Sequence, residues 1–142
     1  MLKELDVKQE NERKKEYLDG YRKCIRQIDR LNEELAEIRI NKMFPSMTQD
    51  GMPHAHNNTD LSVYASRIDK TERKIIKARY LKIQKMKEIT EKIERMDDEN
   101  EKDVLFYRYI RLMKWEEIAA KMKYTYRNVT KIHGRALCNF QI

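Results

Sequence analysis

The sequence predicts an all-α protein in which a long helical hairpin or coiled-coil arm precedes a C-terminal, tri-helical helix-turn-helix domain. Two observations support this fold class. Charged residues make up 39% of the 142 residues, whereas there are only three glycines and two prolines, a composition typical of long helices. In addition, apolar residues recur at helical spacing in two long stretches and again in the C-terminal third.

The first predicted helix spans about residues 3–42. From Tyr17 onward its apolar residues form two sets with a seven-residue repeat: Tyr21, Ile28 and Leu35, and Tyr17, Cys24, Leu31 and Ile38. Such a repeat is typical of a coiled-coil seam. Leu18 and Ile25 widen the apolar stripe, which suits a bundle or a hairpin better than an isolated two-stranded coil.

Residues 43–59 form the predicted linker. They contain both prolines, Gly51 and Asn57-Asn58, which end helices and turn the chain. His54 and His56 also lie in this segment, without a third ligand nearby. We therefore interpret them as part of a polar loop and not as metal ligands.

The second long helix is predicted from about residue 60 to residue 96, again with a seam at roughly seven-residue spacing. Its seam residues are Leu61, Tyr64, Ile68, Ile75, Arg79, Met86, Ile89, Ile93 and Met96, interrupted by Thr71 and Lys82. We expect this helix to fold back on the first as an antiparallel hairpin. Exchange of the segment between two chains is the alternative, because a linker of about 17 residues is long for a hairpin. Residues 1–96 would then form one helical arm.

Residues 97–142 are the predicted second domain. Asp98 and Glu101 have the spacing of a capping box, so a scaffold helix is expected to begin there. Two short amphipathic helices follow, with apolar faces formed by Ile118, Ala119 and Met122 and by Val129, Ile132 and Ala136. Between them lies Lys123-Tyr124-Thr125, in which Thr125 is a suitable N-cap for the second helix. Two such helices joined by a short turn predict a helix-turn-helix.

The outward face of the last helix indicates a DNA-binding surface. Residues 121–142 contain no acidic residue, and the side of the helix away from Val129 and Ile132 carries Tyr126, Arg127, Thr130, Lys131 and Arg135. A helix in the major groove needs side chains that donate to base edges, flanked by cations that neutralise phosphates. The alternative interpretation is a solvated basic face on a small helical domain.

The formal net charge of +7 is unevenly distributed along the chain. Residues 69–96 have 10 Lys/Arg against 5 Asp/Glu and residues 101–142 have 9 against 4, a surplus of +5 in each segment. Residues 1–43, by contrast, have 11 against 10. This distribution favours double-stranded DNA as the partner of the second and third segments.

Other functional classes find no support in the sequence. It has no phosphate-cradling glycine loop, no metal triad and no nucleophile placed beside a base, so we expect no enzyme activity, cofactor or metal site. No apolar run approaches the roughly 20 residues needed to cross a bilayer. Cys24 and Cys138 are far apart and lack ligand spacing, which predicts reduced thiols in a cytoplasmic protein.

Residues 104–137, VLFYRYIRLMKWEEIAAKMKYTYRNVTKIHGRAL, resemble region four of bacterial sigma factors. They resemble still more closely the C-terminal domain of the RinA/ArpU type of phage late-gene transcriptional regulators. The motifs that carry this resemblance are W-E-E-I-A at residues 115–119 and I-H-G-R-A-L at residues 132–137. The linker followed by TDLSVYASRID, residues 59–69, is similar to the same group.

The resemblance implies a sequence-specific DNA-binding transcriptional regulator of phage or prophage origin, associated with the nucleoid of a bacterial host cell. Its helical arm would provide homodimerisation or a contact with RNA polymerase. The residues that it places in the DNA groove are Thr125, Tyr126, Arg127, Asn128, Thr130 and Lys131, with Arg135 near a phosphate. Two positions depart from the family pattern: Lys123 replaces the usual glycine of the turn, and Lys114 replaces the Ser/Thr cap.

Two alternative functions belong to other classes. A small-terminase-like protein for phage DNA packaging also combines a helix-turn-helix with a helical oligomerisation region, and a ring of many copies in solution would favour it. A non-enzymatic helical adaptor would have the same basic helix but would not bind DNA through it. Absence of DNA binding even at low salt would favour the adaptor, because phosphate contacts are strongest there.

Overall fold

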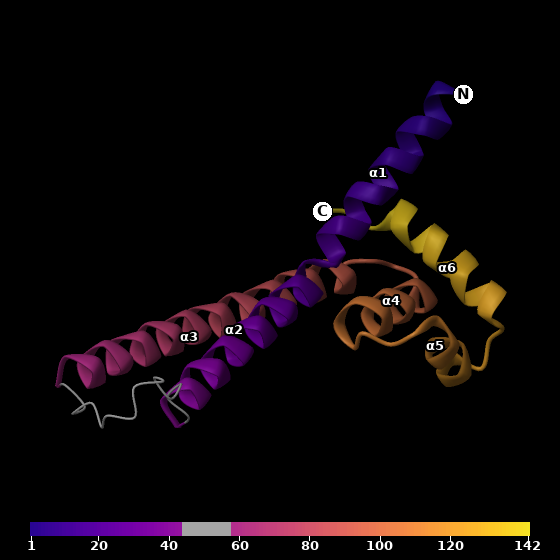
Figure 1. The fold of residues 1–142 in the computed structure, drawn as a ribbon. Coiled ribbons are helices and arrows are strands. Elements are labelled where there is room, and N and C mark those ends of the chain that lie inside the picture. Colours follow the sequence, from indigo (N-terminus) through magenta and orange to yellow (C-terminus); the bar gives the residue numbers. More distant parts are fainter. Residues whose placement is uncertain (44–57) are drawn as a thin grey trace. The chain divides into compact units, whose positions relative to one another are not determined.

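The computed structural model describes residues 1–43 and 58–142, and over these residues the protein is all-α, as predicted (Figure 1). Its elements are α1 (Leu2–Leu18), α2 (Gly20–Met43), α3 (Asn58–Glu94), α4 (Glu99–Leu105), the π-helical segment η1 (Phe106–Ile110), α5 (Trp115–Met122) and α6 (Tyr126–Asn139). The predicted linker, with its prolines and histidines, lies mostly outside the described residues. None of the described helices is both long enough and apolar enough to cross a membrane.

The chain divides into two compact units, one built from Met1–Cys24 together with Lys82–Ile142, and the other from Ile25–Leu81. This division differs from the predicted boundary between residues 96 and 97. The residues that begin the predicted arm, and those that end it, belong to the same unit as the C-terminal helices. The unit that carries the candidate site is therefore discontinuous in sequence.

The first predicted helix, at residues 3–42, is in fact two helices. Asp19 ends α1 with φ −69° and ψ −5°, and Gly20 begins α2. A Cβ atom on Gly20 would lie 2.5 Å from Cε of Lys85, so the glycine lets this lysine pass close to the backbone. We attribute the interruption to this close approach together with the weak helix propensity of glycine.

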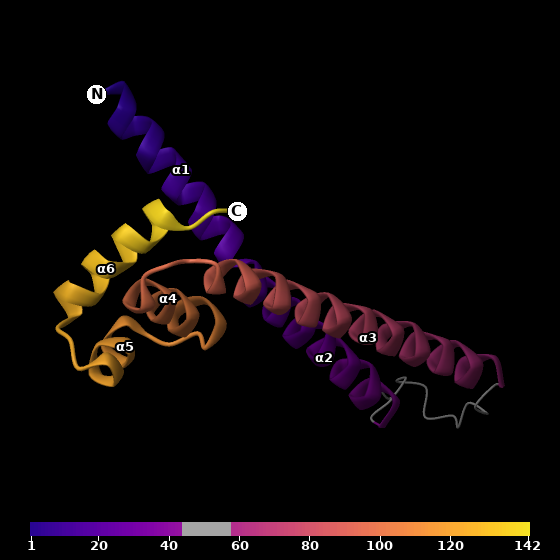
Figure 2. The same cartoon turned by 180° about the vertical axis from the view of Figure 1, so that it is seen from behind.

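In the unit Ile25–Leu81, α2 and α3 lie side by side and run in opposite directions (Figure 1 and Figure 2). Their buried residues are Ile28, Leu35, Ile38, Thr71, Ile75 and Ala78. Arg39 donates to Glu72 across the pair, with 3.3 Å between Nη2 and Oε1. The heptad seam predicted for α2 is thus the face that this unit buries.

The seam predicted for α3 is wrong at Leu61, Arg79 and Met86, which are exposed. Ala78 is buried, and Lys85 is half-buried where Met86 was expected. A seam advances by three or four residues at a time. After Ile75 the seam advances by three residues to Ala78 and not by four to Arg79, and it therefore reaches Lys85 and not Met86. The Lys85 stem is covered while its ammonium group lies 4.3 Å from the centre of the Tyr17 ring.

The unit built from residues 1–24 and 82–142 contains two hydrophobic clusters. The first joins α1, the end of α3, α4, η1 and α6 through Leu18, Ile89, Ile93, Met96, Leu105, Tyr109, Ile110, Ala136, Leu137 and Phe140. The second lies where α4, α5 and α6 meet and consists of Val104, Ile118, Ala119, Val129 and Ile132. Because both clusters include residues of α6, the buried side of this helix packs against the second cluster near its start and against the first near its end.

The start of α4 follows only half of the predicted capping box. The Asp98 side chain accepts from the backbone N–H of Glu101 at 2.9 Å, as expected. Glu101 does not return to the N-cap; it is 5% exposed, and both its carboxylate oxygens accept from Nδ2 of Asn139 at 3.0 Å. The carboxylate therefore joins the beginning of α4 to the end of α6.

Candidate nucleic-acid interface

The helix α5 is weakly capped, as its sequence predicted. Lys114 stands at the N-cap without a side-chain acceptor, and its own backbone N–H donates to Oε2 of Glu117 at 3.3 Å. Glu116 and Glu117 in the first turn suit the positive end of the helix dipole. Ile118 and Ala119 are buried, so α5 presents the predicted apolar face to the second cluster.

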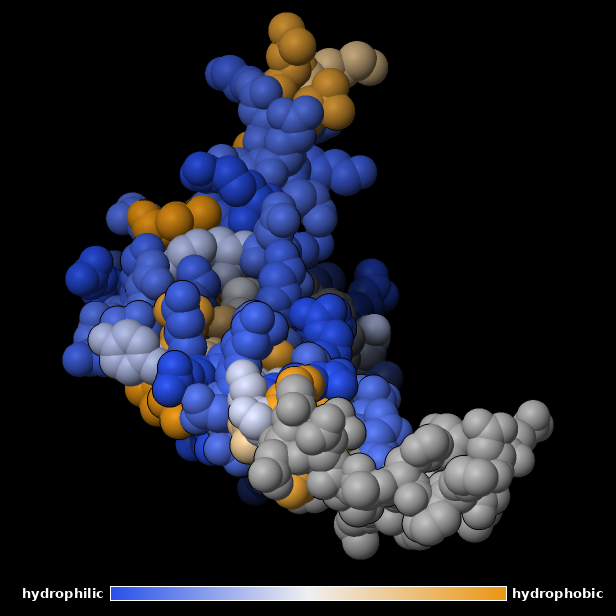
Figure 3. All heavy atoms as spheres, turned by 60° about the vertical axis from the view of Figure 1, so that its left-hand side comes forward, coloured by the Kyte–Doolittle hydropathy of each residue, from blue (hydrophilic) through white to orange (hydrophobic). Residues whose placement is uncertain are grey.

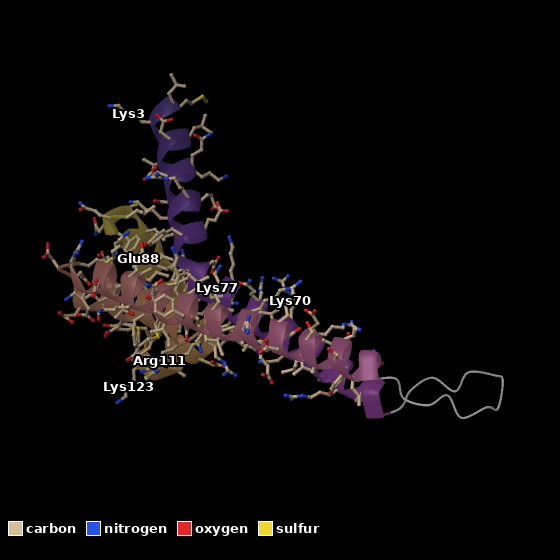
Figure 4. All side chains as sticks on the ribbon, turned by 90° about the vertical axis from the view of Figure 1, so that its left-hand side faces the viewer. Lys3, Lys70, Lys77, Glu88, Arg111 and Lys123 are labelled. Carbon is tan, nitrogen blue, oxygen red and sulfur yellow. The ribbon has the colours of Figure 1, made fainter. Side chains whose placement is uncertain are left out.

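The turn between α5 and α6 has the left-handed backbone that a glycine would favour. Lys123 has φ 59° and ψ 39°, and its exposed side chain extends away from the ribbon (Figure 4). The N–H of Tyr124 donates to the carbonyl of Ala119 at 3.0 Å and closes the end of α5. Leu112, before α5, also has a positive φ of 56°, which the sequence analysis did not anticipate.

The helix α6 begins where it was predicted to begin. Thr125 is its N-cap, and its hydroxyl accepts from the backbone N–H of Asn128 at 3.1 Å. Val129, Ile132, Ala136 and Leu137 are buried, so one side of α6 is fully committed to packing. The opposite side is available to solvent.

The predicted contact residues are exposed except for one. Tyr126 is 50% exposed, and the other exposed members of the set are Thr125, Arg127, Asn128, Lys131 and Arg135. Thr130 is half-buried, and its hydroxyl donates to the carbonyl of Arg127 at 2.9 Å. The hydroxyls of Thr125 and Thr130 thus already have local partners, which weakens the expectation that they contact DNA.

Three cations form a ridge along α6. Arg127, Lys131 and Arg135 are four residues apart, a spacing that puts them on neighbouring turns of one face. None of the three is in an ion pair with any residue that the structure describes. This ridge, defined by these three residues, is a surface of hydrogen-bond donors and positive charge.

His133 faces the opposite direction, into the unit. It is 8% exposed, its Nε2 lies 2.7 Å from the hydroxyl of Tyr109, and its ring meets that of Trp115 edge-on at 4.7 Å. Burial lowers its pKa to about 4, with a smaller contribution from the charges of Lys15 and Arg108. A neutral, packed imidazole is not a phosphate ligand. His133 therefore has a packing role.

Trp115 also has a packing role and not an exposed stacking surface. It is half-buried against the second hydrophobic cluster. The guanidinium of Arg108 covers its ring at 4.4 Å and donates to the carbonyl of Met113 at 3.1 Å. The tryptophan therefore joins η1, the loop before α5 and the buried side of α6.

A lysine of α1 binds the C-terminal end of α6, and sequence reasoning missed it. Lys14 is buried, and its Nζ donates to the carbonyls of Leu137 at 2.8 Å and Cys138 at 3.3 Å. These carbonyls lie at the end of a helix, where backbone acceptors lack intrahelical partners and the dipole is negative. The only sequence signal was that Lys14 stands four residues before Leu18, on the same face of α1.

A surface hollow of about 560 Å³ lies between α1 and α6. Its lining includes Val7, Asn11, His133, Gly134 and Leu137, and a Cβ atom placed on Gly134 would meet nothing within 4 Å. Beyond this hollow the N-terminal half of α1 diverges from α6 (Figure 1 and Figure 2). Its end carries exposed apolar side chains, those of Met1, Leu2 and Leu5 (Figure 3).

Three comparisons with other proteins returned no match: a scan against models of protein families, a search of curated proteins and a search of solved structures. Its chemistry must therefore be inferred from its own residues. Among the residues that the structure describes, there is no group of three or more His, Cys, Asp or Glu side chains that could hold a metal ion. The ridge on α6 is the candidate site with the clearest chemical character.

Proposed function

We propose that this protein binds double-stranded DNA through α6 and regulates transcription. The observation that carries the proposal is the ridge of Arg127, Lys131 and Arg135. It is exposed, forms no ion pair with the described part of the chain, and lies on a helix whose other side is buried. The major groove is about 12 Å wide and admits an α-helix. Side chains on the free face of such a helix donate to base edges, while flanking cations neutralise phosphates.

The contact residues divide into three roles under this proposal. Arg127 and Lys131 enter the groove. Tyr126 and Arg135 lie at the edges of the exposed face and contact the sugar-phosphate backbone, as does the amide of Asn128. Thr125 and Thr130 act indirectly, because the first caps α6 and the second bonds to the backbone of its own helix.

The regulatory role rests on the resemblance of residues 104–137 to sigma region four and to the RinA/ArpU type of phage regulators. One short helix reads only a few base pairs, so a single copy would bind weakly. A second copy of the chain or RNA polymerase, held through the helical hairpin, would raise the affinity through linkage. We propose a phage or prophage origin on the same resemblance.

Binding can be tested with charge-matched variants. Fluorescence anisotropy with a mixed duplex pool should show weaker binding for Arg127→Ala and Lys131→Ala. Loss of a base contact should leave the slope of log K against log salt nearly unchanged, whereas Arg135→Ala, which removes a proposed phosphate contact, should reduce that slope by about 1. Lys70→Ala and Lys77→Ala remove the same charge from exposed positions on α3 (Figure 4) and should bind like the wild type. Unchanged binding by both α6 variants would reject this helix as the reader.

The regulatory role needs a separate measurement. A bound DNA fragment is transcribed in vitro by bacterial RNA polymerase with the wild-type protein or with the double variant Arg127→Ala, Lys131→Ala. A change in transcript yield with the wild type alone supports regulation. Binding without any change in transcript would retain the DNA-binding proposal and reject the regulatory one.

A further inference from the structure

We propose that α6 reads two guanines, about one or two base-pair steps apart, through Arg127 and Lys131. This inference rests on the proposed function and adds to it the chemical identity of the bases. It follows from the part of α6 that is free, from the side chains on that part and from the hydrogen-bonding groups that those side chains carry.

The C-terminal end of α6 is occupied by α1. Lys14 binds the carbonyls of Leu137 and Cys138, and Nδ2 of Asn11 lies 3.7 Å from Sγ of Cys138. Cys138 is on the outward side of α6, one turn beyond Gly134. A duplex cannot lie along the last turn without displacing α1. The first two turns of α6 are therefore the part that can enter a groove.

Within these two turns, Arg127 and Lys131 lie farthest from the core. Successive residues of an α-helix are turned by about 100°, so both are on the side opposite to the midpoint of Val129 and Ile132. Thr130 is half-buried at the border of the exposed face, and its hydroxyl is already engaged. Two cations thus stand at the centre of the reading surface.

The chemistry of these two side chains selects one base edge. Arginine and lysine donate hydrogen bonds and accept none. In the major groove guanine presents two acceptors, N7 and O6, whereas adenine adds a donor to its acceptor and cytosine presents a donor. Residues 121–142 have no carboxylate that could accept from a cytosine amino group. Guanine is therefore the base that satisfies each cation with two acceptors.

The separation of the guanines follows from helix geometry. Four residues of α-helix rise about 6 Å, and stacked base pairs are about 3.4 Å apart. The groove runs obliquely to the duplex axis, so two cations on a helix that lies along it are separated by about one to two base-pair steps. The expected motif has two guanines, adjacent or with one base pair between them.

The experiment begins with selection by the full-length protein from short randomised duplexes at low salt, followed by sequencing. We expect the enriched duplexes to share the two guanines. Each guanine of the best duplex is then replaced in turn by 7-deazaguanine, which lacks the N7 acceptor but still pairs with cytosine. Loss of one bidentate contact should weaken wild-type binding by about 5- to 150-fold.

Two controls assign the contacts. Inosine retains N7 and O6 and lacks only a minor-groove amino group, so it should be tolerated in place of guanine. Arg127→Ala should become insensitive to 7-deazaguanine at one position and Lys131→Ala at the other, while Lys77→Ala keeps both penalties. This pairing of variant and base separates a direct contact from a general loss of positive charge.

The possible failures are distinguishable. Retention of no duplex even at low salt would reject the proposed function itself. Enriched duplexes without a shared pair of guanines, or guanines whose replacement by 7-deazaguanine costs nothing, would overturn the guanine inference and leave DNA binding intact. Penalties that persist in both α6 variants would show that other residues read these bases.

Discussion

His133 links the packing of α6 to ionisation. Its Nε2 is the partner of the buried Tyr109 hydroxyl, and burial also raises the pKa of that hydroxyl above its ordinary value. The pair is therefore held neutral at physiological pH, and the tautomer of the imidazole decides which of the two groups donates. Protonation of the imidazole would place a buried positive charge near Lys15 and Arg108.

We predict that His133 makes the fold sensitive to acid. Its pKa is about 4 in the folded protein and about 6.5 in the unfolded chain, so the unfolded chain binds the proton more readily. The stability that it contributes is complete above pH 6.5 and is lost as the pH falls toward 4. The loss amounts to about 3 kcal/mol. Urea unfolding at a series of pH values measures it.

The matched variant for this measurement is His133→Gln, whose amide can donate to or accept from the Tyr109 hydroxyl but does not titrate in this range. The difference in unfolding free energy between the variant and the wild type should narrow as the pH falls from 6.5 to 4. A difference that is constant over this range would show that other groups control the acid response.

At the scale of elements, α6 contains a glycine that its packing does not require. Gly134 lies in the interior of the helix, beside the hollow between α1 and α6, and a Cβ atom there would meet nothing within 4 Å. Gly20 is different, because a Cβ atom there would collide with Lys85. The two glycines thus allow helix propensity to be separated from close approach.

We predict that Gly134→Ala raises the free energy of unfolding by about 1 kcal/mol, because alanine is the better helix former and nothing opposes its methyl group. Gly20→Ala should gain less, because Lys85 must move away from its position over Tyr17. Thermal and urea unfolding measure both variants. Equal gains at the two positions would contradict the role assigned to the Lys85 contact.

Local periodicity predicted most of the elements. The cap at Thr125 and the buried face of α6 both depend on residues within a turn or two of each other, so the sequence contains them. The π-helical turn of η1 and the interruption at Asp19 depend on which distant side chains must be accommodated. The structure has Ala78 in the seam where the sequence predicted Arg79. Two neighbouring positions fit a seven-residue repeat almost equally well, so the repeat alone does not decide between them.

On the scale of the whole molecule, the unit built from residues 1–24 and 82–142 is held together by contacts between residues far apart in the sequence, which no local pattern predicts. Lys14 reaches the end of α6, and Tyr17 meets the ring of Phe140 with their centres 6.1 Å apart. Tyr17 also donates to Oε1 of Glu88 at 2.7 Å. A lysine and a tyrosine in a charged helix carry no signal of such partners. The exposed donors of the candidate site were predictable, whereas the residues that hold α6 from behind were not.

We predict that Lys14→Met destabilises the protein by about 1.5 to 3 kcal/mol, the usual range for hydrogen bonds to a charged group. Methionine keeps the apolar stem but leaves the carbonyls of Leu137 and Cys138 without their donor. Lys15→Met is the adjacent control: its ammonium group pairs with Glu12 at the surface, so its loss should cost less than about 1 kcal/mol. Urea unfolding followed by circular dichroism compares them, and equal losses would contradict the assignment.

The discontinuity of the larger unit has a consequence for synthesis. Leu18 leaves the ribosome early, but it is buried in the same cluster as Phe140, which is added only after both long helices have been made. Until then Leu18 and Lys14 of α1 lack their native neighbours. The helices α6 and α1 can therefore reach their native packing only together, late in translation, so the ridge on α6 takes its final place only when the last helix has been made.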